Sequence, residues 1–77
     1  MARATILDWT DEDVQLKLNE QRAVKYQVFR EDEIYFLDVC SRAGEPIHTL
    51  QLPEGMKLDK SSYEVLLRYV LVDLIAA

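Results

Sequence analysis

The fold is decided by the stretch Tyr63–Ala77, with the sequence YEVLLRYVLVDLIAA. At about 100° per residue, its apolar side chains predict a helix with two apolar faces. The broad stripe consists of Tyr63, Leu66, Leu67, Val70, Leu71, Leu74 and Ala77. The narrow stripe, on nearly the opposite side, consists of Val65, Tyr69, Val72 and Ala76. A surface helix normally buries one stripe, so the narrow stripe needs cover from the same chain, from a second copy or from a partner.

The start of this helix is marked by a serine and a glutamate three residues apart. Ser61 and Glu64 have the spacing of a capping box, in which the serine hydroxyl and the glutamate carboxylate each accept from a backbone amide at the helix end. The sequence therefore predicts that the final helix opens at Ser61.

Three short strands are predicted before this helix. Val24–Val28 alternates apolar and polar residues, and Ile34–Cys40 is apolar on both faces. The third, Ile47–Leu52, lies between a turn containing Gly44 and Pro46 and the stop at 53–55. Because the links have the length of hairpin turns, we expect an antiparallel meander.

The N-terminal segment has two competing interpretations. Thr10 and Asp13 resemble a capping box with Asp in place of Glu, which favours a helix over residues 11–21. The alternation of Val14, Leu16 and Leu18 with polar residues favours a strand instead. We take the helix as the expected structure and keep the strand as the alternative.

The expected fold is thus α+β, a single small domain over residues 1–77. It combines a three-stranded antiparallel meander with a short N-terminal helix and a C-terminal amphipathic helix of 15 residues packed on the sheet. A chain of this length is only marginally stable by itself. It has one cysteine and therefore no disulfide framework, so association would help to stabilise it.

The composition sets bounds on location and partners. The N-terminal apolar run is too short for a signal peptide, and the C-terminal one contains charges and is too short to span a bilayer. We therefore expect a cytoplasmic protein, in a bacterial or host cytosol, with no membrane partner. The net charge of −5 argues against direct binding to nucleic acid, which requires a basic surface.

Catalytic and metal-binding motifs are not found in the sequence. The single cysteine and histidine, Cys40 and His48, fall on neighbouring predicted strands, but nothing marks a third group that would orient them. The acids from Asp8 to Asp13 do not have the spacing of a calcium loop. The prediction is a protein without enzymatic activity, cofactor or metal.

Two clusters of acids have a functional and an ordinary interpretation. The clusters are Asp11, Glu12 and Asp13 near the N-terminus and Glu31, Asp32 and Glu33 at a predicted hairpin tip. The functional interpretation is that they steer the chain toward a basic partner or mimic nucleic acid phosphates in a basic groove. The ordinary interpretation, which is favoured, is a helix cap and a solvated turn.

The predicted function is therefore a protein–protein interaction module. It would be a small acidic inhibitor, adaptor or assembly factor that occupies a surface on a larger protein, and a homo-oligomer is expected. The predicted contact residues are Val65, Tyr69, Val72 and Ala76, with Tyr69 as the anchor and the two acidic clusters as steering groups. The alternative is a phage-type inhibitor, similar to anti-CRISPR proteins or to polymerase and nuclease inhibitors, that uses its acids to mimic nucleic acid.

Overall fold

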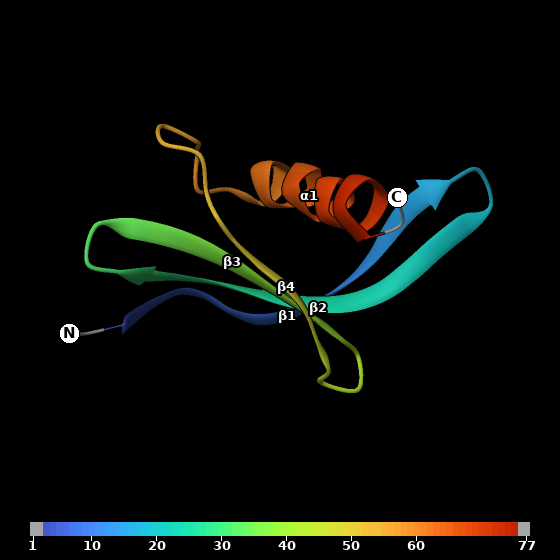
Figure 1. The fold of residues 1–77 in the computed structure, drawn as a ribbon, viewed down its shortest axis with the longest axis horizontal. Helices are drawn as coiled ribbons and strands as arrows, with labels where there is room; N and C mark the ends of the chain where they lie inside the picture. Colours follow the sequence, from blue (N-terminus) through green and yellow to red (C-terminus); the bar gives the residue numbers. More distant parts are fainter. Residues whose placement is uncertain (1–2, 76–77) are drawn as a thin grey trace.

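The computed structural model describes residues 3–75. Four antiparallel strands form one sheet, and a helix lies across one of its faces (Figure 1). The strands are β1 (Arg3–Lys17), β2 (Glu20–Glu31), β3 (Ile34–Ser41) and β4 (Pro46–Gln51). They lie side by side in chain order, so each neighbouring pair is a hairpin. The predicted α+β class and antiparallel meander are confirmed, but the sheet has four strands rather than three.

The predicted N-terminal helix is wrong, because residues 11–17 belong to β1. Val14 pairs with Arg22 across the first hairpin and is buried, as the alternating pattern requires. Thr10 caps no helix; its hydroxyl donates a hydrogen bond to the carbonyl of Asp8 at 2.8 Å. The local capping signal is overridden because β2 offers the backbone of this segment a long partner strand.

The three strands predicted from the sequence are all present, with different ends. Val24–Val28 is the central part of β2, which runs on to Glu31, so the turn is only Asp32–Glu33. Asp32 has a φ of 58°, and Asn19 in the first hairpin has a φ of 67°. Aspartate and asparagine tolerate this left-handed region better than other side chains. Each of these two residues therefore suits its turn.

The first hairpin extends beyond the rest of the sheet. Pairing between β2 and β3 begins at Val24 opposite Ser41, so residues 20–23 of β2 pair only with β1. In Figure 1 this end of the hairpin curves up beside the C-terminal half of the helix. Val14 and Leu16 on this part of β1 pack against the core.

The core lies between the helix and one face of the sheet. The sheet contributes alternate residues of its two central strands, namely Val24, Tyr26, Val28, Leu37 and Val39. The helix contributes Tyr63, Leu66, Leu67, Val70 and Leu71. These five belong to the predicted broad stripe, which is therefore confirmed as the side that packs on the sheet. Leu74 of the same stripe is 42 % exposed, and Ala77 lies outside the described residues.

The helix consists of an α-helical part, α1 (Lys60–Arg68), and a π-helical part, η1 (Tyr69–Ile75). Its N-cap lies two residues earlier than predicted. Asp59, rather than Ser61, is the N-cap, and its carboxylate accepts a hydrogen bond from the Ser62 amide at 2.9 Å. The i→i+5 hydrogen bonds of a π-helix widen its turns.

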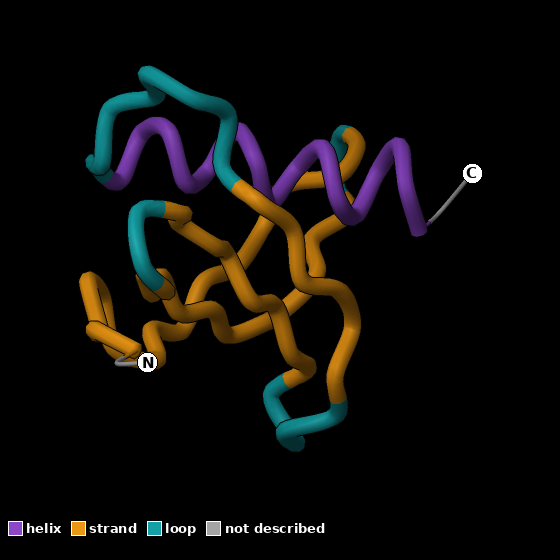
Figure 2. Tube along the Cα trace, turned by 60° about the vertical axis from the view of Figure 1, so that its left-hand side comes forward, coloured by secondary structure: helices purple, strands orange, loops and turns teal. Residues whose placement is uncertain are grey.

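The opposite face of the sheet carries no second layer among the described residues, as the turned view in Figure 2 shows. On this face, side chains from neighbouring strands pack against each other and form hydrogen bonds. Phe29 and Phe36 stack with ring centroids 5.2 Å apart, and the Arg3 guanidinium lies 3.8 Å from the Phe29 centroid. Asp38 accepts hydrogen bonds from Gln27 and Thr49 on the two adjacent strands. We call this side of the sheet the open face.

Candidate interaction surface

One side of the helix presents apolar side chains to solvent. Val65 is 64 % exposed, Tyr69 46 % and Val72 37 %. Together with Arg68 and Asp73 they line a shallow groove, and we call these five residues the outer helix face. It contains three of the four residues of the predicted narrow stripe. The fourth, Ala76, lies outside the described residues.

Within residues 3–75, no other element covers this surface. The N-terminal segment forms β1 and lies in the sheet, so it does not cover the narrow stripe. Its Trp9 lies near Lys25 instead, with the ammonium 5.5 Å from the ring centroid. The outer helix face is therefore part of the molecular surface.

The first acidic cluster is divided between the two faces of the sheet. Asp11 and Asp13 lie opposite Lys25 and Ala23 and form ion pairs with Arg42. The distances are 3.7 Å from Asp11 Oδ1 to Arg42 Nε and 3.0 Å from Asp13 Oδ1 to Arg42 Nη2. Glu12 pairs with Val24 and therefore points to the side of the helix. The three carboxylates do not form one surface.

The second acidic cluster is at the tip of the β2–β3 hairpin. Glu31 forms an ion pair with Arg3 at 3.2 Å, Asp32 is in the turn, and Glu33 lines a pocket. Lys25, which is opposite Asp11, is six residues from Glu31 on β2. At roughly 3.3 Å per residue, this separates the clusters by about 20 Å. The ion pairs with Arg42 and Arg3 also reduce the net negative charge of the first and the second cluster.

Cys40 and His48 do not meet. His48 pairs with Val39, whose side chain is in the core, whereas Cys40 is the next residue and points to the opposite face. Cys40 is only 7 % exposed. Burial, and then the nearby Asp38 carboxylate, raises the pKa of its thiol. A reactive thiolate requires the opposite environment.

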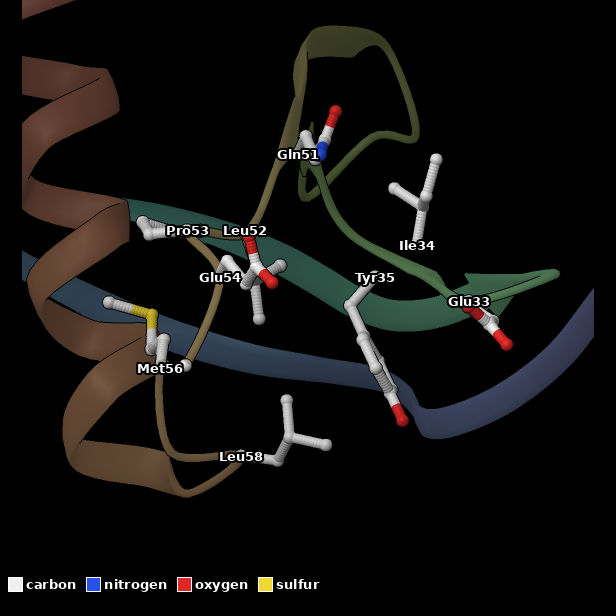
Figure 3. A pocket seen from close by; sticks show the side chains of 10 residues that line it. Glu33, Ile34, Tyr35, Gln51, Leu52, Pro53, Glu54, Met56 and Leu58 are labelled. Carbon is white, nitrogen blue, oxygen red and sulfur yellow. The ribbon is translucent and has the colours of Figure 1, made fainter.

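A hollow of about 380 Å³ lies between β3 and the segment that links β4 to α1. Figure 3 shows its side chains gathered around this linking segment. Apolar groups from Tyr35, Leu52 and Met56 line it, and carboxylates of Glu33 and Glu54 lie beside them. The lining contains no histidine, cysteine or basic side chain.

Sequence reasoning missed the aromatic contact on the open face. Phe29 and Phe36 are equally far from the two-residue turn at Asp32–Glu33, so the hairpin places them directly opposite each other. This symmetry is visible in the sequence once the turn is fixed. The position of Arg42 against Asp13 was not visible, because 29 residues separate them.

Among residues 3–75, no group of three His, Cys, Asp or Glu side chains is arranged to hold a metal ion. None of the described helical segments combines the length and the apolar character needed to cross a bilayer. Comparison with protein-family models, with curated proteins and with solved structures gives no match.

Proposed function

We propose that this chain is a non-enzymatic protein-binding module that docks onto another protein through the outer helix face. The observation that carries the proposal is the exposure of Val65, Tyr69 and Val72 on a helix whose opposite stripe is already buried. Exposing contiguous apolar side chains costs free energy that docking would recover. Tyr69 is the anchor because tyrosine is enriched among residues that dominate binding energy.

Action as an inhibitor, adaptor or assembly factor in the cytoplasm fits this kind of surface. A small module of this type works by occupying a site on a larger protein, and such work requires no catalytic group. The separation of Cys40 from His48 supports the non-enzymatic part of the proposal. The net charge of −5 would speed the encounter with a basic partner, since long-range attraction acts mainly on association rates.

Mimicry of nucleic acid is the less supported alternative. A mimic needs carboxylates spread over one surface, unpaired and ready to replace phosphates. In this chain Asp11 and Asp13 share Arg42, and Glu31 pairs with Arg3. The acidic residues therefore support a steering role better than a mimetic one.

Site-specific photo-crosslinking tests the proposal. A photoreactive phenylalanine analogue at position 69, in cells that make the protein, should give a covalent adduct with another polypeptide. The same analogue at Ile34 is the matched control, because Ile34 is 43 % exposed and lies outside the outer helix face. Val65→Asp in the position-69 variant should remove the adduct. Circular dichroism would establish that this variant stays folded.

The mass of the adduct separates the possible partners. An adduct with a larger protein supports docking as an inhibitor or adaptor, and one of twice the chain mass supports self-association. Equal crosslinking from positions 69 and 34, or none from position 69, would refute the outer helix face as a binding surface.

A further inference from the structure

A second hollow, of about 330 Å³, lies between β1 and the start of α1. Tyr26 of β2 and Tyr63 of α1 line it, with their ring centroids 6.2 Å apart and the two rings tilted by 59°. We call it the tyrosine hollow. Its volume is at the lower end of the range of small-molecule sites, so it suits a molecule with one ring and a short chain.

Irregular pairing of β1 shapes the apolar wall of this hollow. Ile6 and Leu7 both line it, although neighbours in a regular strand point to opposite faces. The pairing with β2 shifts register on both sides of Leu7, toward Thr5 and toward Thr10. Such irregularities re-aim side chains and are over-represented beside functional sites. Leu58, from the segment before α1, adds an apolar side chain that is 43 % exposed.

The hydroxyls of the two tyrosines lack hydrogen-bond partners although their side chains are almost completely buried. Tyr26 is 1 % exposed and Tyr63 4 %. Within residues 3–75, neither hydroxyl takes part in a hydrogen bond. Neither is sealed in the core, since no fully buried side-chain polar atom of the described residues lacks a partner. The hydroxyls therefore meet solvent at the hollow that their side chains line, where a ligand can supply the missing partner.

The charges beside the hollow are mainly negative. Burial, and then the carboxylates of Glu12 and Glu64, raises the pKa of the Tyr26 hydroxyl. Asp59 is part of the lining itself. Lys60 also lines the hollow, but its side chain is 71 % exposed and its ammonium lies 4.0 Å from Glu64 Oε1. Three carboxylates beside one ammonium favour a cationic ligand over an anionic one.

We propose that the tyrosine hollow binds a small organic ammonium ion with an apolar body. The apolar body packs against Ile6, Leu7 and Leu58, and the ammonium donates hydrogen bonds to the hydroxyl oxygens of Tyr26 and Tyr63. The tyrosine rings add to the attraction, because the face of an aromatic ring attracts cations. This site goes beyond the proposed function, since it shares no residue with the outer helix face.

Titration with three probes of similar shape and different charge tests the ligand class. The probes are phenethylammonium, 2-phenylethanol and 3-phenylpropionate. Phenethylammonium should shift the amide signals of Leu7, Tyr26 and Tyr63 in nitrogen–proton NMR spectra, with a Kd on the order of 1 mM. The neutral alcohol should bind more weakly, and the carboxylate should cause no shifts at the same concentrations. Equal binding of all three probes, or shifts centred on the outer helix face, would overturn the proposal.

Removal of single hydroxyl groups tests the proposed contacts. Tyr26→Phe and Tyr63→Phe should each weaken the binding of phenethylammonium by about tenfold, because each removes one acceptor of a charged hydrogen bond. Tyr69→Phe removes a hydroxyl from the outer helix face and is the matched control, which should bind as the wild type does. Unchanged binding in both hollow variants, or equal weakening in the control, would contradict the proposed contacts.

The stability of the same variants separates a ligand site from a structural role. The midpoint of urea unfolding should not fall in Tyr26→Phe or Tyr63→Phe, because the hydroxyls have no partner in the described chain to lose. A fall in both midpoints would show that the hydroxyls support the fold and would overturn the site. Crosslinking from position 69 is independent of these results, so the proposed docking surface and the tyrosine hollow can fail separately.

Discussion

Arg42 ties the β3–β4 turn to β1 across the open face: its Nη2 lies 3.0 Å from Asp13 Oδ1. Its Nε donates a hydrogen bond to the Val24 carbonyl on β2, the strand between them, at 2.8 Å. One side chain thus joins three segments of the sheet. Its positive charge also offsets the repulsion between Asp11 and Asp13 on the sheet surface.

Removal of Arg42 should destabilise the fold by about 1–2 kcal/mol. The loss combines a charged hydrogen bond to a backbone carbonyl with a partly exposed ion pair. Asp13→Ala should cost less, about 0.5 kcal/mol, because it removes only the exposed pair. Urea unfolding of Arg42→Ala and Asp13→Ala measures both values. If the two variants lose equal stability, the bond to Val24 contributes nothing.

The two sides of the helix should respond differently to truncation. Leu67 is fully buried, whereas Val65 is 64 % exposed. Leu67→Ala should cost about 2–5 kcal/mol, because it leaves a cavity in the core. Val65→Ala should change the free energy of unfolding by less than about 0.5 kcal/mol at dilute, monomeric concentration. Comparable losses from the two variants would mean that the outer helix face is also part of the core.

The N-cap should make stability depend on pH in the acid range. Hydrogen bonds from the backbone and side chain of Ser62 hold the pKa of Asp59 below its ordinary value of 3.8. A carboxyl whose pKa is lowered by folding stabilises the native state above its ordinary pKa. That contribution is lost as the pH falls through the lowered value. Between pH 7 and the acid range, the free energy of unfolding of the wild type should therefore fall by more than that of Asp59→Asn.

Thermal melts of wild type and Asp59→Asn at several pH values below 5 would measure this effect. The wild type should lose its advantage over the variant as the acid is titrated. Parallel melting curves for both proteins over the whole acid range would argue against a role for this carboxylate in capping.

Cys40 should react slowly with thiol reagents in the native state. Its side chain is 7 % exposed, and burial raises the pKa of the thiol, so little thiolate is present at neutral pH. A chromogenic disulfide reagent at pH 7 should label it much faster in denaturant than in buffer. Fast labelling of the folded protein would revive the hypothesis of a reactive cysteine.

The helix was predictable because its signal is local and repeats. The broad stripe of Tyr63, Leu67 and their neighbours can cover a sheet in only one orientation, and these residues form the core. The N-terminal segment was not predictable in the same way. Thr10 and Asp13 carry a helix start signal, while Val14 and Leu16 carry strand alternation. Pairing with β2 decides between them, and pairing is not a local property.

The candidate surface could be predicted in part. Helical periodicity alone placed Val65, Tyr69 and Val72 together, and the structure leaves them exposed. The acidic clusters were predicted as patches because their residues are adjacent in sequence. In a strand, neighbouring residues point to opposite faces, which separates Glu12 from Asp11 and Asp13. The ion pairs to Arg42 and Arg3 depend on contacts between residues far apart in the chain.

The overhang of the β1–β2 hairpin has a consequence for motion. Val28 lies between two partner strands, whereas Gln21 pairs with β1 alone. Two-stranded ribbons are marginally stable by themselves, so the tip should open and close while the rest of the sheet stays intact. The amide hydrogens of a single strand would then exchange with solvent deuterium by two routes. Near Gln21 they would exchange through fraying, and at Val28 only when the whole molecule unfolds.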